Sequence, residues 1–363
     1  MTSPAPPSFE ALLARDDVIW MGQNTTHLPP APEVLQALAD SAARREFQLY
    51  APPAGFAELR ELIVEDLALP GFRAWVVDGA VAGLHHVCTT LAPRISRMIT
   101  SDPGWPWPGR FVSIAGVPVT RLAVYDQPRA LLSAEQIARV VEPNSVIYLI
   151  DPLNPLGGSY TATELADIVE VARSTDSYLI HDTTYRHFAD SHTLAAPMYP
   201  EKTFTTYSFS KWLGLAGLRV GAVVAAPDLL DGLMAVPPNP LGAGIMGQRA
   251  AIAGLRIRDR WLAQLRETNR RNLDAVERTV AESGRGSVVV PRSQGNFLAI
   301  DITDTGWSAD ALCAEILDRT GVFIRPGTYQ SPMFGERFVK VSTSVPAGWV
   351  DRFCAAWTSV PSR

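Results

Sequence analysis

Short apolar runs alternate with amphipathic stretches through the middle of the chain. This alternation is typical of βαβ units stacked around a parallel sheet. The run that ends at Ile150 is continuously apolar, as expected for a strand covered on both faces. Thr161 and Glu164 have the spacing of a capping box, which predicts a helix from there to about Arg173. Four strands are predicted, at residues 145–150, 177–181, 203–207 and 220–226.

The pattern changes at about Arg256, where a long helix rich in Arg, Glu and Leu is predicted to begin and to run to about Ser283. Two strands at residues 297–302 and 338–342, with a helix at 308–319 between them, predict a smaller α+β unit. We therefore predict an α/β protein with two domains. The large domain, with a mostly parallel central sheet flanked by helices, covers residues 45–255. The small α+β domain combines residues 1–44 and 256–363.

Residues capable of chemistry follow several of these strands. Asn154, Asp182 and the segment Ser208–Lys211 each come just after the C-terminal end of a predicted strand. In open α/β sheets ligands bind at that edge. We expect these residues to surround one crevice.

Lys211 lies among apolar residues, with Ser208 and Ser210 before it and Arg219 after it. Water-excluded surroundings lower the pKa of a lysine and yield a free amine that can form a Schiff base. Hydroxyls and an arginine are suited to a phosphate. Together they indicate pyridoxal 5'-phosphate (PLP), which carries a carbonyl and a phosphate on one small ring. A surface lysine in a turn is the alternative, and the other residues decide between the two.

PLP needs further partners, and the sequence offers them. Asp182 is suited to face the pyridine nitrogen, where an acid keeps the ring protonated and electron-withdrawing. Asn154 and Tyr185 are available for hydrogen bonds to the ring hydroxyl. Trp105, in a loop bounded by prolines, offers a face on which the ring can stack, although core packing explains a lone tryptophan equally well.

These motifs resemble the class I and II aminotransferases of the PLP fold-type I superfamily, especially the branch that includes histidinol-phosphate aminotransferase. The resemblance covers roughly residues 18–345, and its most specific part is Ser208-Phe-Ser-Lys211 followed by Arg219-Val-Gly. Asn154-Pro-Leu-Gly157 resembles the Asn-Pro-Thr-Gly turn of the family. Asp182 and Tyr185 have the spacing of its ring-nitrogen acid and ring-hydroxyl tyrosine.

The resemblance implies a homodimer whose active sites lie at the subunit interface. It also implies that Lys211 holds the cofactor and then shuttles a proton between the substrate Cα and the cofactor C4′. Tyr50 would reach the phosphate of the neighbouring subunit. Gly22 begins a stretch similar to the N-terminal segment that closes over the substrate in this family.

The expected phosphate site departs from the family in one respect. A turn of small residues, Asp78–Gly83, leads into an apolar helix predicted at residues 84–91. Backbone N–H groups at a helix start bind anions, so Ala80 and Val81 are expected to contact the phosphate. Because residues 80–82 carry no hydroxyl, Tyr50 and the serines and arginine near Lys211 would contribute more of the binding.

Lys340 is the most serious departure. It stands where the family usually has an arginine that clamps the substrate α-carboxylate, and a lysine lacks the planar two-pronged grip of a guanidinium. Either Lys340 binds the same carboxylate, or the substrate differs or is held another way. In the second case Arg325 would supply the clamp, with polar contacts from Gln23 and Asn24.

The sequence therefore predicts an aminotransferase that exchanges an amino group between an amino acid and a 2-oxo acid in two stages. Lys340 keeps open an alternative, in which the same cofactor serves β- or γ-elimination, replacement or oxidation of an unusual amino acid. A non-catalytic PLP-binding regulator is disfavoured, because Lys211, Asp182 and Arg219 are all present and no DNA-reading segment is appended.

The composition agrees with a small-molecule enzyme. A net charge of −5 and the lack of a dense basic block argue against nucleic acid as a partner. The chain has 3 cysteines, widely separated, which fit a reducing compartment and no disulfide framework. The histidines offer no metal-ligand arrangement. The N-terminus lacks the pattern of a secretory signal, and no apolar run approaches the roughly 20 residues that span a bilayer. We expect a cytoplasmic protein without membrane, metal or nucleic-acid partners.

Overall fold

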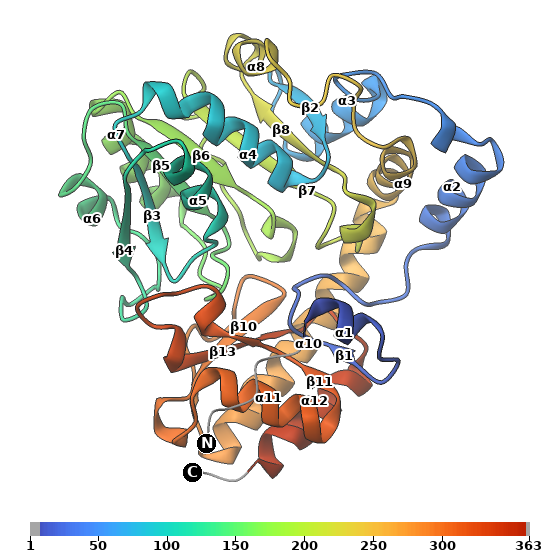
Figure 1. The fold of residues 1–363 in the computed structure, drawn as a ribbon, viewed down its shortest axis with the longest axis vertical. Helices are drawn as coiled ribbons and strands as arrows, with labels where there is room; N and C mark the ends of the chain where they lie inside the picture. Colours follow the sequence, from blue (N-terminus) through green and yellow to red (C-terminus); the bar gives the residue numbers. More distant parts are fainter. Residues whose placement is uncertain (1–7, 361–363) are drawn as a thin grey trace.

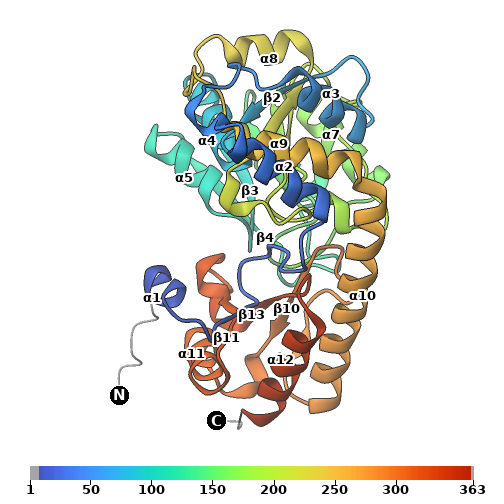
Figure 2. The same ribbon diagram turned by 90° about the vertical axis from the view of Figure 1, so that its right-hand side faces the viewer.

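The computed structural model describes residues 8–360, so residues 1–7 and 361–363 of the predicted small domain lie outside the described residues. The chain forms two parts, stacked one above the other in Figure 1. The upper part contains a seven-stranded sheet and the lower part a four-stranded one. Helix α10 (Arg258–Ser283) runs along one side of the molecule from the upper part to the lower one (Figure 2). No helix within residues 8–360 is both long and apolar enough to cross a bilayer.

The seven-stranded sheet has the strand order β2-β8-β7-β6-β5-β3-β4. Strands β4, β3, β5, β6 and β7 are parallel to one another, whereas β8 runs antiparallel to both β7 and β2. The predicted mostly parallel sheet is confirmed, and the four strands predicted from the sequence are β5 to β8. The bounds are β2 Arg73–Val77, β3 Met98–Asp102, β4 Val119–Ala123, β5 Val146–Ile150, β6 Tyr178–Asp182, β7 Thr203–Ser208 and β8 Gly221–Ala225.

Helices flank this sheet, and every residue of β5 is buried, as its continuous apolar run requires. The capping box forms as predicted: the Glu164 N–H donates to the Thr161 hydroxyl, and the Glu164 carboxylate accepts from the Thr161 N–H. The helices of this part are α3 Ala57–Asp66, α4 Ala80–Leu91, α5 Trp107–Ile114, α6 Ala134–Ala138, α7 Ala162–Ser174, α8 Pro227–Met234 and α9 Ile245–Arg256.

The carboxyl ends of β5, β6 and β7 meet at one edge of the sheet. Ile150 is the Cα partner of Asp182, and Asp182 is the Cα partner of Thr206. The turn with Asn154, the carboxylate of Asp182 and the segment that carries Lys211 therefore open onto the same edge.

The lower part is built on an antiparallel sheet of order β12-β13-β10-β9, with β10 paired to β13 along its whole length. Helices α10, α11 and α12 pack a second hydrophobic cluster against it. The predicted strands and the helix at residues 308–319 are confirmed. The bounds are β9 Ser287–Val288, β10 Phe297–Asp301, α11 Ala309–Thr320, β12 Arg325–Pro326, β13 Phe338–Ser342 and α12 Ala347–Ser359.

The N-terminal segment is shared between the two parts. Strand β1 (Ile19–Trp20) pairs with β11 (Val322–Phe323) of the lower part, and the short helix α1 (Phe9–Leu13) packs beside them. Helix α2 (Pro32–Ala43) instead packs on α9 in the upper part. Its residue Val34 belongs to the core of the large sheet. We therefore propose that the large domain begins near residue 31, earlier than the predicted boundary at residue 45.

Candidate active site

A cavity of about 310 Å³ opens where β5, β6 and β7 end, a volume within the range of ligand pockets. Tyr50 is the one predicted site residue that does not line it. The predicted residues that do are Gly22, Gln23, Asn24, Ala80, Val81, Trp105, Asn154, Asp182, Tyr185, Ser208, Ser210, Lys211, Arg219, Arg325 and Lys340. Further lining residues were not predicted: Thr25, Leu84, Ile150, Thr184, Ala216 and Tyr329. Each of these six is close in sequence to a predicted one, which was the only signal available.

Lys211 follows the end of β7, and its Nζ donates a hydrogen bond to the backbone oxygen of Gln23 at 3.0 Å. Burial, and then the charge of Arg219, lower the pKa of Lys211 to about 8 against the opposing effect of Asp182. A substantial fraction of this amine is therefore neutral near physiological pH. A neutral amine is the form that attacks a carbonyl.

The carboxylate of Asp182 is held by donors on both oxygens. The hydroxyls of Thr184 and Thr206 donate to Oδ1 at 2.6 and 2.8 Å. The Tyr148 hydroxyl donates to Oδ2 at 2.9 Å. Burial raises the pKa of Tyr148 well above its ordinary value, so this hydroxyl remains a donor. The carboxylate is therefore fixed in orientation at the cavity wall.

Asn154 and Tyr185 are joined by a third residue, Asn24. The Asn24 Nδ2 lies 3.2 Å from both Asn154 Oδ1 and the Tyr185 hydroxyl. Asn154 Oδ1 also accepts from Gln330 Nε2 at 2.9 Å and from Lys340 Nζ at 3.2 Å. The sequence assigned Asn24 to the substrate, whereas the structure places its amide against the two residues expected to face the cofactor ring.

Donors suited to an anion lie at the start of α4. Gly79, with φ +83°, precedes the first backbone N–H groups of this helix, whose dipole favours an anion there. Arg219 reaches the same place, where its Nη2 donates to the backbone oxygen of Asp78 at 3.3 Å. A Cβ at Gly79 would lie 2.2 Å from Arg219 Nη2. Glycine therefore leaves the space that this guanidinium occupies beside the helix start.

Two basic side chains, Arg325 and Lys340, line the cavity on the side of the small sheet. The guanidinium of Arg325 lies 4.9, 5.1 and 4.7 Å from the ring centroids of Phe9, Phe323 and Tyr329. Lys340 is buried, and burial together with the charges of Arg325 and Lys211 lowers its pKa well below the ordinary value. Within residues 8–360 neither side chain forms an ion pair with a carboxylate.

The family model for aminotransferase class I and II matches residues 16–356. The chain belongs to this family. It is 26% identical to an aspartate aminotransferase from Pyrococcus horikoshii over 92% of this chain and 88% of that protein. It is 28% identical to histidinol-phosphate aminotransferase 1 from Mesorhizobium japonicum over 93% of this chain and 88% of that protein. The structure of N-succinyldiaminopimelate aminotransferase from Mycobacterium tuberculosis superposes with a TM-score of 0.83 at 25% identity, covering 93% of this chain and 92% of that one.

These comparisons confirm the predicted family, fold class and reaction class. Members of the family use PLP, and the chain is a transferase that moves an amino group between an amino acid and a 2-oxo acid. The predicted roles of the individual site residues are not tested by any of these similarities.

Two predicted residues lie at the rim or outside the site of this aminotransferase. Trp105 lines the cavity from the loop after β3, and the N–H of its neighbour Gly104 donates to the Gln330 oxygen at 3.1 Å. That bond ties the loop to the lower part of the molecule. Tyr50 is 78% exposed and does not line the cavity of its own chain.

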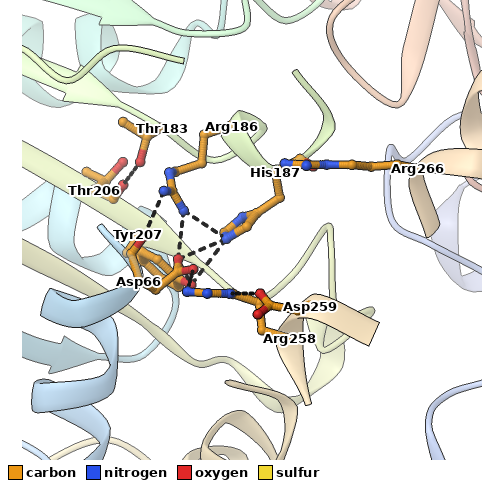
Figure 3. Close-up of polar contacts among 9 residues, drawn as sticks. All are labelled: Asp66, Thr183, Arg186, His187, Thr206, Tyr207, Arg258, Asp259 and Arg266. Carbon is orange, nitrogen blue, oxygen red and sulfur yellow. Dashed lines mark hydrogen bonds and ion pairs between the residues drawn. The ribbon is translucent and has the colours of Figure 1, made fainter. Parts of the chain in front are cut away.

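One buried carboxylate, Asp66 at the end of α3, joins several segments of the aminotransferase (Figure 3). It accepts hydrogen bonds from four side chains, which with Asp66 we call the Asp66 cluster: Arg186 at 2.7 Å, His187 at 3.0 Å, Tyr207 at 2.6 Å and Arg258 at 2.7 Å. Arg186 and His187 directly follow Tyr185, and Tyr207 directly precedes Ser208. The cluster therefore fixes, from outside the cavity, two segments that carry cavity residues.

The sequence offered no metal-ligand arrangement, yet the fold brings Asp151, His181 and His192 within 4.8 Å of one another. The Ala195 N–H donates to His181 Nδ1 at 3.3 Å. Burial lowers the pKa of His181, so the ring is neutral and its proton lies on Nε2, which faces Asp151. A protonated Nε2 is a donor to the carboxylate and not a metal ligand.

Proposed function

We propose that this aminotransferase binds PLP through Lys211 Nζ and acts on an amino acid whose carboxylate is bound by Lys340 and Arg325. The observation that carries the proposal is a single cavity lined by Lys211, Asp182 and Arg219. These three side chains suit the aldehyde, the ring nitrogen and the phosphate of the cofactor. The lowered pKa of Lys211 and the space left by Gly79 for Arg219 support this fit.

PLP, when bound, supplies the aldehyde and an electron-withdrawing ring. In our proposal Asp182 faces the ring nitrogen and Trp105 packs against the ring. The phosphate is bound by the N–H groups of Ala80 and Val81 with the side chains of Ser208, Ser210 and Arg219. Once the substrate has displaced it, the amine of Lys211 would accept the proton from the substrate Cα and pass it to the cofactor C4′ within the same half of the exchange, and the second half would reverse this transfer.

The chain is proposed to act as a homodimer in which Tyr50 contributes to the partner's phosphate site. Tyr50 is one of a group of exposed apolar residues on α2 and in the segment after it, and exposed apolar surface is common at interfaces between proteins. Gly242 lies against the backbone of Pro52, which places residue 241 beside this group. The exposed fractions are Leu35 51%, Phe47 61%, Leu49 63%, Tyr50 78% and Leu241 48%.

A cytoplasmic location is proposed from the cysteines. Cys88, Cys313 and Cys354 are all free, and Cys88 and Cys313 are buried. Free thiols persist in reducing compartments.

The test uses the purified chain mixed with PLP and a panel of amino acids, with no oxo-acid acceptor. Release of one equivalent of 2-oxo acid per bound cofactor, without ammonia, is expected for amino-group transfer. Continuous release of ammonia or consumption of oxygen would identify elimination or oxidation instead. The Lys211→Ala variant should lose the visible absorbance of the bound cofactor, and retention of that band would refute the assignment of Lys211.

The dimer is tested separately by light scattering on wild type and on Tyr50→Ala. Wild type should have twice the mass of one chain. Tyr50→Ala is expected to remain dimeric and to bind PLP about tenfold more weakly, as for the loss of one hydrogen bond to a charged group. A monomeric wild type that binds PLP with full affinity would refute the shared site.

A further inference from the structure

Hydrogen bonds fix both the backbone and the side-chain amide of Asn24. It is 1% exposed, with a left-handed backbone at φ +57°. Its N–H donates to the Ser342 hydroxyl at 2.8 Å, and that hydroxyl donates to Asn24 Oδ1 at 3.1 Å. Asn296 Nδ2 donates to the backbone oxygen of Asn24 at 2.7 Å. With Oδ1 occupied by Ser342, the two N–H bonds of Nδ2 remain for other partners.

The two N–H groups of Asn24 Nδ2 donate to the two residues that the sequence predicts beside the ring hydroxyl of the cofactor. Nδ2 lies 3.2 Å from Asn154 Oδ1 and 3.2 Å from the Tyr185 oxygen. The opposite orientation of the amide would place two carbonyl-type oxygens, Asn24 Oδ1 and Asn154 Oδ1, against each other. The hydrogen bonds with Ser342 and Asn154 therefore agree on one orientation.

As a result, the side-chain oxygen of Asn154 has no acceptor capacity left for a ligand. Oδ1 has two lone pairs and already accepts from three donors, Asn24, Gln330 and Lys340. Its Nδ2 has no hydrogen-bond partner among the described residues, and Asn154 lines the cavity. The unused amide donor of Asn154 is therefore available to a ligand.

The consequence for Tyr185 is similar. Its oxygen accepts from Asn24, and within residues 8–360 no acceptor for its own hydrogen is found. Burial raises the pKa of Tyr185 above its ordinary value, so the hydroxyl keeps its hydrogen. Asn24 therefore donates a hydrogen bond to each of these two residues. The amide N–H of Asn154 and the O–H of Tyr185 are left free to donate to a ligand in the cavity.

We propose that Asn24 is a positioning residue for the cofactor ring: by donating to Asn154 and Tyr185 it makes both of them donors to the anionic oxygen of a 3-hydroxypyridine. This inference rests on the proposed function, because it requires PLP in the cavity. It reassigns Asn24 from the substrate to the cofactor. It also links the ring oxygen to β13, because Ser342 is the residue that orients Asn24.

The experiment is a pH titration of the visible absorbance of the PLP-loaded protein. Two donors stabilise the anionic ring oxygen, so losing their alignment should raise the apparent pKa of the absorbance change. Asn24→Asp keeps the shape but turns the donor into an acceptor, which attracts the Tyr185 hydrogen and adds a negative charge. We expect a rise of about one pH unit or more, a tenfold change in proton affinity.

Asn24→Gly provides a second variant, because glycine adopts φ +57° without strain and removes only the amide. It should shift the titration in the same direction by a smaller amount. A double-mutant cycle with Tyr185→Phe shows whether Asn24 acts on the titration directly or through Tyr185. If Asn24 acts through Tyr185, the shift caused by Asn24→Gly is smaller in the Tyr185→Phe background.

The matched control is Thr26→Val in the same segment. The Thr26 hydroxyl donates to the Ser344 oxygen at 3.0 Å and contacts neither Asn154 nor Tyr185. Thr26→Val should titrate as wild type. The proposal is overturned if both Asn24 variants titrate as wild type, or if Thr26→Val shifts the titration as much as they do. A wild-type protein that gains no visible band with PLP would instead refute the proposed function.

Discussion

Arg325 and Lys340 are Cα partners on the adjacent antiparallel strands β12 and β13, and both side chains line the same cavity. Burial and the charge of Arg325 opposite it lower the pKa of Lys340 well below its ordinary value. Within residues 8–360 no carboxylate forms an ion pair with either one. An anionic ligand would be attracted by Arg325 and would favour the ammonium form of Lys340, which is why we assign the substrate carboxylate to the pair.

Replacing Lys340 by alanine is expected to raise KM for the true substrate by roughly 10- to 100-fold, the effect of losing one hydrogen bond to a charged group. Binding of PLP should change little, because Asn154 Oδ1 keeps the hydrogen bonds from Asn24 and Gln330 when the one from Lys340 is lost. Steady-state kinetics and an absorbance titration with PLP measure the two effects. Unchanged kinetics would remove Lys340 from the substrate site.

Binding of a carboxylate at this pair is expected to take up a proton. The pKa of Lys340 is well below its ordinary value because of burial and then the charges of Arg325 and Lys211. A bound anion favours the ammonium form, so it raises this pKa, and carboxylate affinity should increase as the pH falls. Calorimetric titration of the PLP-loaded protein with an unreactive monocarboxylate, in buffers of different ionisation enthalpy, measures the uptake. Lys340→Met should abolish it, and equal heats for wild type in all buffers would contradict the prediction.

Gly79→Ala is expected to weaken PLP binding about tenfold or more, because its Cβ would lie 2.2 Å from Arg219 Nη2 and displace that guanidinium. Gly71→Ala is the matched control. Gly71 also has a positive φ, of +86°, but a Cβ there meets nothing within 4 Å. Both variants should lose stability, at roughly 1–3 kcal/mol, because a side chain at positive φ is strained; Gly79, with φ +83° and ψ +154°, lies in a region essentially confined to glycine. Only Gly79→Ala should require more PLP for saturation, and equal affinities in the two variants would count against Arg219 as a phosphate ligand.

The sequence predicted many of the cavity residues because they lie at or just after the carboxyl ends of strands. An apolar run located β5, and short runs of β-branched, aromatic and apolar residues located β6 and β7. The rule that ligands bind at the carboxyl edge of such strands brought Asn154, Asp182 and Lys211 together. The direction of β8 was not predictable in this way. A buried strand has the same apolar pattern whether it runs parallel or antiparallel.

Contacts between residues far apart in the sequence were also not predictable. Asn24 meets Asn154 and Tyr185 across 130 and 161 positions, and no local pattern indicates such a contact. Helix α2 is amphipathic, so the pattern predicts a buried face but not that the partner is α9 in the upper part. In the sequence Asp66 looks like an ordinary acidic residue at the end of a helix, although in the structure four side chains form hydrogen bonds with it.

The Asp66 cluster predicts how stability depends on pH (Figure 3). Burial disfavours ionisation of Asp66, but the hydrogen bonds from His187 and Tyr207 and the charge of Arg186 outweigh it and lower the pKa of Asp66 well below its ordinary value. A carboxyl whose pKa is lower in the folded state contributes stability above its unfolded pKa, roughly 3.9. This contribution is lost only as the pH falls below that value.

His187 acts at higher pH. Burial lowers its pKa to about 4 in the folded protein, against the hydrogen bond with Asp66. The unfolded state therefore binds a proton near pH ~6.5 that the folded state does not bind until about 4. Stability should decline as the pH falls through this window, before the contribution of Asp66 is lost.

Asp66→Asn should lower the free energy of unfolding at pH 7 by about 3–5 kcal/mol, because it leaves the Arg186 and Arg258 guanidiniums without their shared carboxylate. The variant should also lack the decline below pH ~4. Asp259→Asn is the control, since Asp259 pairs with the same Arg258 but its side chain is 87% exposed. Its effect should stay within about 1 kcal/mol, as for other exposed ion pairs. Denaturant unfolding of both variants between pH 3 and 8 measures these differences, and equal losses in the two would show that burial of Asp66 does not set its contribution.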